Sequence, residues 1–350
     1  MLAEHQILQK HPQSTRQPEL PHAADVAPLD ESQAYHLQLH GALDAAVATR
    51  LRHTLRQKLA HNTPPEQLIL NLASVRRIDA HGLGALLYLR DLCSRHHCHL
   101  TLQAPSPAVV KILIRTRLAD GFRITPPVAS HRRDATWHHR LDRWHTCLDQ
   151  FLAAVGLVAL FPLLTLIALA IKLDSPGPVF FRQPRMGSAK AALTDGPIEG
   201  QIFSIIKFRT MVPDAEKMLS ELQARNQYAD GAFFKLRDDP RISRVGRFLR
   251  RTSLDELPQL INVLKGQMRL VGNRPLPLYE AAALLEPWQR VRFLAPAGIT
   301  GLWQISGRSD TDAMERLVLD TYYSATRTWL GDWWVLVKTL RVFFRQNGAR

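Results

Sequence analysis

The sequence predicts an α/β protein with two folded parts on either side of a membrane segment. Two observations lead to this prediction. Strand-like and helix-like hydrophobic patterns alternate from about residue 35 to residue 124, which is typical of a sheet covered by helices. A run of 21 residues without charge, 151–171, then separates this region from a longer second part.

The first part contains strand and helix signals in strict turn. Period-two alternation predicts a strand at 35–39, and apolar residues at helical spacing predict a helix at 44–59. The pattern continues with a strand at 68–72, a helix at 82–92, a strand at 99–103 and a helix at 109–118. We therefore expect a small α/β domain at 31–125.

Two polar stretches flank this domain. Residues 1–30 are rich in Pro, Gln and His and lack the apolar core of a signal peptide, so we expect them to be disordered. Residues 126–140 are polar and basic, which predicts a linker. The second domain is then expected at 141–350.

The composition indicates an anionic partner at a membrane. The chain has 350 residues and a formal net charge of +14. Its basic residues are dispersed, and no zinc-finger spacing or RNA-binding signature accompanies them, which argues against nucleic acid. Arginines beside a long apolar segment fit an anionic lipid surface better. Three cysteines without framework spacing indicate a reducing, cytoplasmic setting.

The charge-free segment 151–171 is expected to enter the membrane without crossing it. A straight helix of this length would measure about 32 Å, enough to span a hydrocarbon core of roughly 30 Å. However, Pro162 removes a helical hydrogen bond in the middle of the segment. Basic residues lie on both sides, such as Arg140 and Lys172, and the positive-inside rule keeps both ends in the cytoplasm. These features predict a re-entrant helix that breaks at Pro162.

An acidic pair, Asp255 and Glu256, stands between arginines in the second domain. The arginines nearest to it are Arg247, Arg250, Arg251 and Arg274. This pattern predicts a phosphate site in which a metal ion and the arginines share the anion. Ser253 to Glu256 also matches a capping box, with Ser253 as the N-cap of a helix and Asp255 in its first turn. The competing interpretation of these four residues is an ordinary amphipathic helix start.

Five blocks of the second part recur together in one known family. They are IKLDSPGPVFFRQ (171–183), IKFRTM (206–211), DPRISRVGRFLRRTSLDELPQL (239–260), LVGNRP (270–275) and GITGLWQISGR (298–308). By these blocks, in this order, the chain from about Leu141 to its C-terminus resembles the bacterial sugar transferases. These enzymes are the monotopic polyprenol-phosphate phosphoglycosyl transferases.

The resemblance implies a reaction and a location. A sugar 1-phosphate would pass from a UDP-sugar to undecaprenyl phosphate, which initiates an exopolysaccharide or a related glycan. Asp255 would attack the β-phosphate, expel UMP and hold a covalent phosphosugar. Glu256 would either help Asp255 to hold Mg²⁺ or hold the Asp255 side chain in position. The resemblance also implies a compact α/β domain, held monotopically on the cytoplasmic face of the bacterial inner membrane, with the helix break at Pro162.

Five cations are candidate substrate ligands. Alternation along 202–208 predicts that Lys207 and Arg209 share one face, where they would bind phosphate or orient Asp255. Arg274 is followed by Pro275, which stiffens its backbone. The other two candidates are Arg250 and Arg308. The alternative interpretation of Lys207 and Arg209 is a pair of surface cations.

The chain departs from the family pattern at three positions. Where the family commonly has GDMSLVGPRP, this chain has GQMRLVGNRP at 266–275. Gln267 replaces an aspartate, Arg269 a serine and Asn273 a proline. We therefore expect the local site to be more cationic by two charges, with an effect on rate or sugar preference.

The first domain has a resemblance of its own. GALD (41–44) and LILNLASVRRIDAHGLGALL (68–87) are similar to the STAS fold of anti-sigma-factor antagonists. Phosphorylated members of that family carry Ser or Thr directly after the aspartate that corresponds to Asp79, whereas Ala80 and His81 follow it here. This argues against a Ser/Thr phospho-switch. We expect a docking module, with His81 as a surface residue or a contact to a protein partner.

Two functional hypotheses therefore remain. The first is the membrane-bound transferase. The second is a membrane-tethered regulatory scaffold, in which the STAS-like domain is active and the transferase half is degenerate. The C-terminal stretch from Trp329 to Arg345 mixes aromatic and basic residues at helical spacing. It fits either a helix in the lipid headgroup layer or a core helix that closes the domain.

Overall fold

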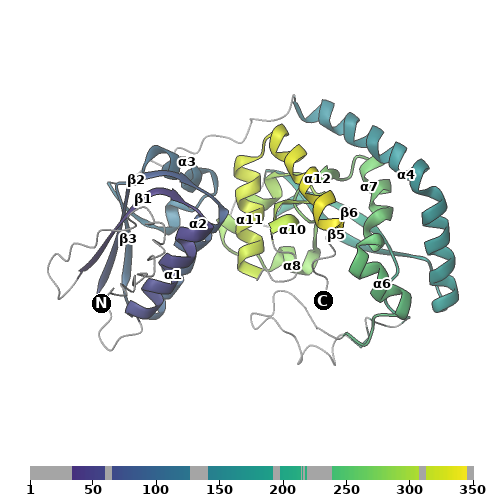
Figure 1. Cartoon of the computed structure of the whole chain (residues 1–350), viewed down its shortest axis with the longest axis horizontal. Coiled ribbons are helices and arrows are strands. Elements are labelled where there is room, and N and C mark those ends of the chain that lie inside the picture. The colour runs from purple at the N-terminus through teal and green to yellow at the C-terminus, as the bar shows by residue number, and fades with distance from the viewer. Residues whose placement is uncertain are drawn as a thin grey trace, which may run out of the picture.

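The computed structural model describes residues 34–59, 65–126, 141–191, 198–213, 215, 217–218, 239–306 and 313–344. It has two α/β parts packed side by side, with one long helix along the outer side of the second part (Figure 1). The α/β class expected from the sequence is confirmed. Three expectations fall outside the described residues: the disorder of residues 1–30, most of the linker 126–140 and the site candidate Arg308.

The N-terminal part is a parallel sheet with three helices. Its strands, in spatial order, are β1 (Ala34–Leu43), β2 (Gln67–Ile78), β3 (His99–Gln103) and β4 (Arg123–Thr125). The helices that connect them are α1 (Ala45–Leu59), α2 (Ala80–Arg95) and α3 (Pro107–Arg115), with a short turn η1 (Ala119–Gly121). The expected strands and helices are all present, and β1 and β2 are longer than their sequence signals.

Leucines build the core of this domain, and Asp79 begins α2. On β2, Leu68, Leu70 and Leu72 alternate inward and are fully buried. The Asp79 side chain caps α2 by accepting from the Gly82 backbone N–H at 2.9 Å. A Cβ at Gly82 would lie 2.2 Å from the Leu43 carbonyl oxygen, so only glycine allows α2 to approach β1 this closely.

The second part is built on two small sheets. β5 (Phe180–Ala191) pairs antiparallel with β6 (Glu199–Phe208) on one side and β8 (Leu276–Pro277) on the other. β7 (Arg269–Val271) pairs parallel with β9 (Gly298–Thr300). The helices and turns between them are α6 (Arg244–Thr252), η3 (Leu254–Gln259), α7 (Leu260–Leu264), α8 (Leu278–Ala282), α9 (Pro287–Arg290), η4 (Val291–Leu294), α10 (Leu302–Ser306), α11 (Ala313–Thr326) and α12 (Trp329–Phe344).

The apolar segment lies in α4 (Leu141–Asp174), which corrects one expectation. We predicted that the helix breaks at Pro162, but α4 is a single unbroken helix of 34 residues with Pro162 inside it. An internal proline bends a helix when the neighbouring turns stay hydrogen-bonded. Figure 1 shows α4 changing direction along its length as it curves around the second part. The helix therefore continues through Pro162 instead of ending there.

One side of α4 packs on the protein and the rest exposes apolar side chains. Ile167 and Ile171 are buried in a cluster with Phe208 and Leu249, whereas Val158 is 78% exposed. Only 11% of the most apolar stretch is buried, and Trp144–Asp174 is long and apolar enough to cross a membrane. A soluble protein rarely exposes so much contiguous apolar surface, so this face fits contact with lipid.

Helix α12 closes the domain on one side and exposes apolar and aromatic residues on the other. Val335 is buried in a cluster with Val271 and Tyr323 and closes the domain. On its other side Leu330 is 72% exposed and Trp334 about half exposed. This mixture of core contacts and exposed aromatic residues is compatible with a helix at the lipid headgroup level.

The two parts are docked through α2 and α11. Leu83 of α2 and Val318 of α11 belong to one continuous cluster of buried side chains, and the two helices lie next to each other in Figure 1. Polar contacts cross the same boundary, among them Arg90 Nη1 to Glu286 Oε2 at 3.5 Å. His81 Nε2 lies 3.8 Å from Glu315 Oε1, Tyr322 donates to the Ile78 carbonyl at 3.4 Å, and Arg115 donates to the Ala325 carbonyl at 3.1 Å. His81 is thus a contact within the chain.

Candidate active site

Asp255 and Glu256 lie on the tight turn η3, which corrects the predicted capping box. Ser253 has φ 55° and ends α6 in the left-handed conformation, and its side chain makes no capping bond to η3. The segment after it is a 3₁₀ helix rather than the start of an α-helix. Successive side chains in a 3₁₀ helix point about 120° apart. Asp255 and Glu256 therefore face different surroundings.

Glu256 is held between two cations, one from strand β6 and one from the loop between β7 and β8. Its Oε1 accepts from Lys207 Nζ of β6 at 2.7 Å and from Arg274 Nη2 at 2.9 Å. Its other oxygen, Oε2, is buried without a hydrogen-bond partner among the described residues. Burial alone would raise the pKa of Glu256, but the charges of Arg274 and Lys207 outweigh it and lower this pKa to about 2. Glu256 is therefore a fixed anion at neutral pH.

Asp255 stands beside this ion pair without joining it. Its residue is 9% exposed, and within the described part of the chain its carboxylate makes no hydrogen bond. Burial, followed by the charge of Glu256, raises the pKa of Asp255 to about 6. Lys207, Arg250 and Arg274 oppose that shift. Asp255 is thus a buried carboxylate outside the ion pair, and it binds its proton more tightly than an ordinary aspartate does.

The charges around Glu256 also shift the pKa values of its two cationic partners, Lys207 and Arg274. Burial, and then the charge of Arg274, lowers the pKa of Lys207 to about 8. The charge of Glu256 raises the pKa of Arg274. Lys207 therefore keeps its proton at neutral pH and loses it under mildly alkaline conditions.

Arg209 and Arg250 differ in how close they come to the carboxylates. Arg250 donates to Thr210 Oγ1 at 2.9 Å and is near enough to Asp255 for the two charges to interact. Arg209, in contrast, donates to the carbonyl oxygens of Ser175 and Pro176, both at 2.7 Å. The sequence placed Arg209 on one face with Lys207, but the structure gives it the task of fixing the turn after α4. β6 ends before Arg209, so strand alternation no longer applies there.

Arg185 is a site residue that the sequence did not reveal. It lies on β5, and its charge interacts with Arg274, Glu280 and Glu256. Burial and the charge of Arg274 lower its pKa to about 10. Its Nε is buried without a partner among the described residues. The sequence did offer one signal for Arg185. Strand alternation places Gln183 and Arg185 on the same face of β5, which could have marked that face as polar.

The three departures from the family pattern do not add charge at the acidic pair. The side chain of Arg269 is nearly buried and forms an ion pair with Asp149 of α4, which cancels its charge. Gln267 Oε1 accepts from Asn262 Nδ2 at 2.8 Å, as a carboxylate would. Asn273 is buried, and its side chain donates to Arg292 of η4 and to Ser324 of α11. Pairing with Asp149 therefore removes one of the two expected positive charges, whereas the carboxylate charge absent at Gln267 stays absent.

The donor set suits a divalent cation bound together with phosphate. Glu256 Oε2 is an orphaned buried oxygen, and Asp255 supplies a second carboxylate next to it. Across the described ranges no group of three or more His, Cys, Asp or Glu side chains could hold a metal. Mg²⁺ typically binds through one or two protein carboxylates plus substrate phosphates and water. The two carboxylates fit that mode.

Comparison with known proteins identifies the family of the second part. The family model described as bacterial sugar transferase matches residues 141–346. Undecaprenyl-phosphate galactose phosphotransferase from Salmonella typhimurium is 35% identical over 266 residues, covering 75% of this chain and 52% of that protein. Exopolysaccharide production protein ExoY from Sinorhizobium fredii is 38% identical over 209 residues, covering 57% of this chain and 85% of that protein.

A shorter match comes from Escherichia coli. Its UDP-glucose:undecaprenyl-phosphate glucose-1-phosphate transferase is 40% identical over 177 residues, covering 48% of this chain and 32% of that protein. The chain thus spans about half, or less, of the length of several relatives. A second family model, described as Mlab, STAS domain, matches residues 29–126. The N-terminal part therefore carries a STAS domain.

We predict that ionised Asp255 destabilises the folded protein. Its folded pKa of about 6 lies above the unfolded value near 4, so ionisation favours unfolding. The cost is absent below the unfolded pKa and complete above the folded one. Asp255→Asn should therefore raise the thermal midpoint at both pH values, and the gain in unfolding free energy should be about 1.4 kcal/mol larger at pH 8 than at pH 5.

The control for this measurement is Asp120→Asn, which changes an exposed aspartate of the STAS domain. It should leave the thermal midpoint unchanged at both pH values. Equal shifts for Asp255→Asn at pH 5 and pH 8 would contradict a raised pKa for Asp255.

Proposed function

The chain belongs to the bacterial sugar transferase family, and on that basis we propose that it transfers a sugar 1-phosphate from a UDP-sugar to undecaprenyl phosphate. The product would begin an exopolysaccharide or a related glycan. The observation that carries this proposal is the unequal environment of the two carboxylates. Glu256 is hydrogen-bonded to Lys207 and Arg274, while the neighbouring Asp255 makes no such bond within the described part of the chain.

Asp255 has the properties of a nucleophile. One carboxylate oxygen attacks the β-phosphorus of the UDP-sugar, and an acyl phosphate bond forms. The bond from that phosphorus to the oxygen bridging the two phosphates breaks, and UMP leaves with the electron pair. An oxygen of undecaprenyl phosphate then attacks the same phosphorus and frees the carboxylate. An ionised carboxylate needs no general base for this step, so a pKa of about 6 keeps Asp255 competent at neutral pH.

The surrounding cations serve the phosphates. Lys207 and Arg274 border the carboxylates directly, and Arg250 and Arg185 lie within range of their charges. Glu280 also lies within range of Arg185 and Arg274, so four cations face three carboxylates and leave a net positive site for a diphosphate. Charge that moves to the leaving UMP is best stabilised by such preorganised cations. Mg²⁺ held by Asp255 and Glu256 would add neutralisation of phosphate charge.

The proposed acceptor requires a membrane location. The exposed apolar face of α4 and the aromatic face of α12 lie on the second part, which also carries Asp255. We propose monotopic attachment at the cytoplasmic face of the inner membrane, with α4 re-entering on the side it came from. Its curvature, its internal proline and its basic flanks support that topology. The relatives named for galactose and glucose transfer favour a UDP-hexose as donor.

UMP release by the detergent-solubilised protein tests the function. With Mg²⁺, undecaprenyl phosphate and a panel of UDP-sugars, we expect one hexose donor to give sustained release. Asp255→Asn should lower turnover at least about 10³-fold, because it removes the nucleophile. The exposed control Asp120→Asn should keep full activity. No release from folded wild-type protein with any donor would favour the regulatory scaffold instead.

The dependence of kcat/KM on pH is expected to be bell-shaped. It should rise as Asp255 ionises around pH 6 and fall as Lys207 loses its proton around pH 8. Lys207→Arg keeps a cation that stays protonated, so it should retain the acidic limb and lose the alkaline one. An alkaline limb that survives in Lys207→Arg would assign that ionisation to another group.

A further inference from the structure

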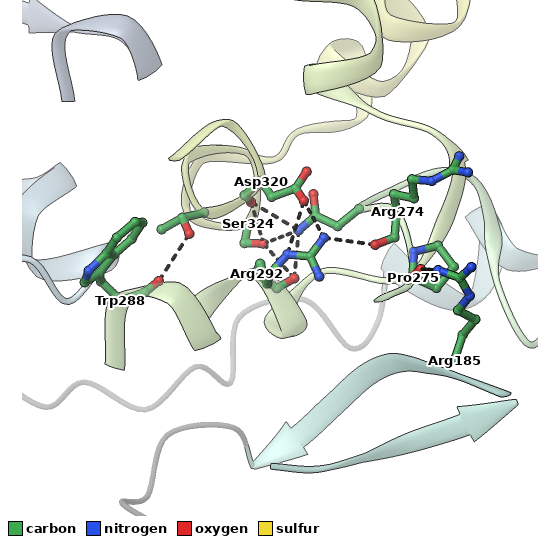
Figure 2. A network of polar contacts seen from close by, with 9 residues as sticks. Arg185, Arg274, Pro275, Trp288, Arg292, Asp320 and Ser324 are labelled. Carbon is green, nitrogen blue, oxygen red and sulfur yellow. Dashed lines mark hydrogen bonds and ion pairs between the residues drawn. The ribbon is translucent and has the colours of Figure 1, made fainter. Parts of the chain in front are cut away.

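The loop that carries Arg274 is fixed by hydrogen bonds at three successive residues, 273–275. The Asn273 side chain donates to the Arg292 carbonyl at 2.7 Å and to Ser324 Oγ at 2.9 Å. The Arg274 carbonyl accepts from Arg292 Nη2 at 2.9 Å, and the Pro275 carbonyl accepts from Arg185 Nη1 at 3.2 Å. Figure 2 shows Arg185 and Arg292 approaching this loop from two sides.

Arg292 is in turn fixed by Asp320 of α11. Arg292 Nε lies 3.2 Å from Asp320 Oδ2, and Arg292 Nη2 also donates to that oxygen. The two residues are each 2% exposed. Figure 2 shows Arg292 between Asp320 and the backbone of Arg274. A buried charge pair of this kind has a geometry that solvent cannot relax, so the guanidinium presents its Nη2 to the Arg274 carbonyl in one orientation.

Arg274 needs such support because of what its side chain does. It is 30% exposed at the side chain, and it reaches Glu256 across the rim of the site. A long side chain loses contact easily when its backbone moves, and a misplacement of about 1 Å can cost a large factor in rate. Holding the carbonyls of residues 274 and 275 removes that backbone freedom before substrate arrives.

We propose that Arg292, oriented by Asp320, is a positioning residue that holds Arg274 in place for Glu256 and the substrate phosphate. Arg292 touches neither carboxylate of the acidic pair, so it acts through the Arg274 backbone. The inference rests on the proposed transferase function, because Arg274 matters here as a phosphate ligand. It extends that function to α11, the helix on which the STAS domain is docked.

The variant Arg292→Lys separates positioning from folding. A lysine keeps the positive charge beside Asp320, but a single ammonium lacks the planar fork that reaches both the carboxylate and the Arg274 carbonyl. We expect a stably folded protein whose kcat/KM for the best UDP-sugar falls about 10- to 100-fold. The matched control is Arg327→Lys, at a second pair in which Arg327 Nε lies 3.6 Å from Asp332 Oδ2. In that control, kcat/KM should fall by less than about threefold.

A double-mutant cycle tests whether Arg292 acts through Arg274. In an Arg274→Lys background, Arg292→Lys should cost less than about threefold, because the side chain it positions has already been changed. The same cycle is run on UDP affinity by calorimetry, which stays measurable when turnover is very slow. Full cost in both backgrounds, or no cost in wild type, would overturn the proposal. Absence of UMP release from wild type would instead overturn the transferase function itself.

Discussion

The structure depends on how one buried anion, Glu256, is neutralised. A buried carboxylate costs several kcal/mol unless it is paired and hydrogen-bonded. Here two cations share its Oε1, Lys207 from β6 and Arg274 from the loop between β7 and β8. The β5–β6 hairpin, the turn η3 and that loop must therefore meet at one point. The local fold of the second part can be understood as the arrangement that brings these three segments together.

This constraint also creates the contrast on which the chemistry rests. Because Lys207 and Arg274 are committed to Glu256, they stabilise ionised Asp255 less than they otherwise would, and burial raises its pKa. The result is one carboxylate that is fixed and one that is available. The membrane-facing helix is tied into the same region. Asp149 of α4 pairs with Arg269 of β7, and Ile167 and Ile171 pack near the end of β6.

Local patterns in the sequence predicted much of this structure. The leucine alternation of β2 and the charge-free run of α4 specify a strand and an apolar helix with few alternatives. The blocks containing Lys207, Asp255, Glu256 and Arg274 identified residues that do come together. Other features depend on contacts between distant residues. Asp149 and Arg269 are 120 positions apart, so no local pattern shows that their charges cancel. The contacts of Arg209 and the docking of α2 on α11 also join distant residues, so local patterns did not predict them. The predicted capping box at Ser253 did not form because Ser253 adopts a left-handed conformation that ends α6.

The most direct test of the account is the mass of the intact protein after incubation with a UDP-hexose and Mg²⁺ in the absence of undecaprenyl phosphate. The account predicts an added hexose phosphate that maps to the peptide carrying Asp255 and disappears when undecaprenyl phosphate is supplied. The adduct should be absent in Asp255→Asn and should still form, more slowly, in Glu256→Gln. An adduct on Glu256, or sustained turnover of wild type without any adduct on Asp255, would contradict the division of roles between the two carboxylates.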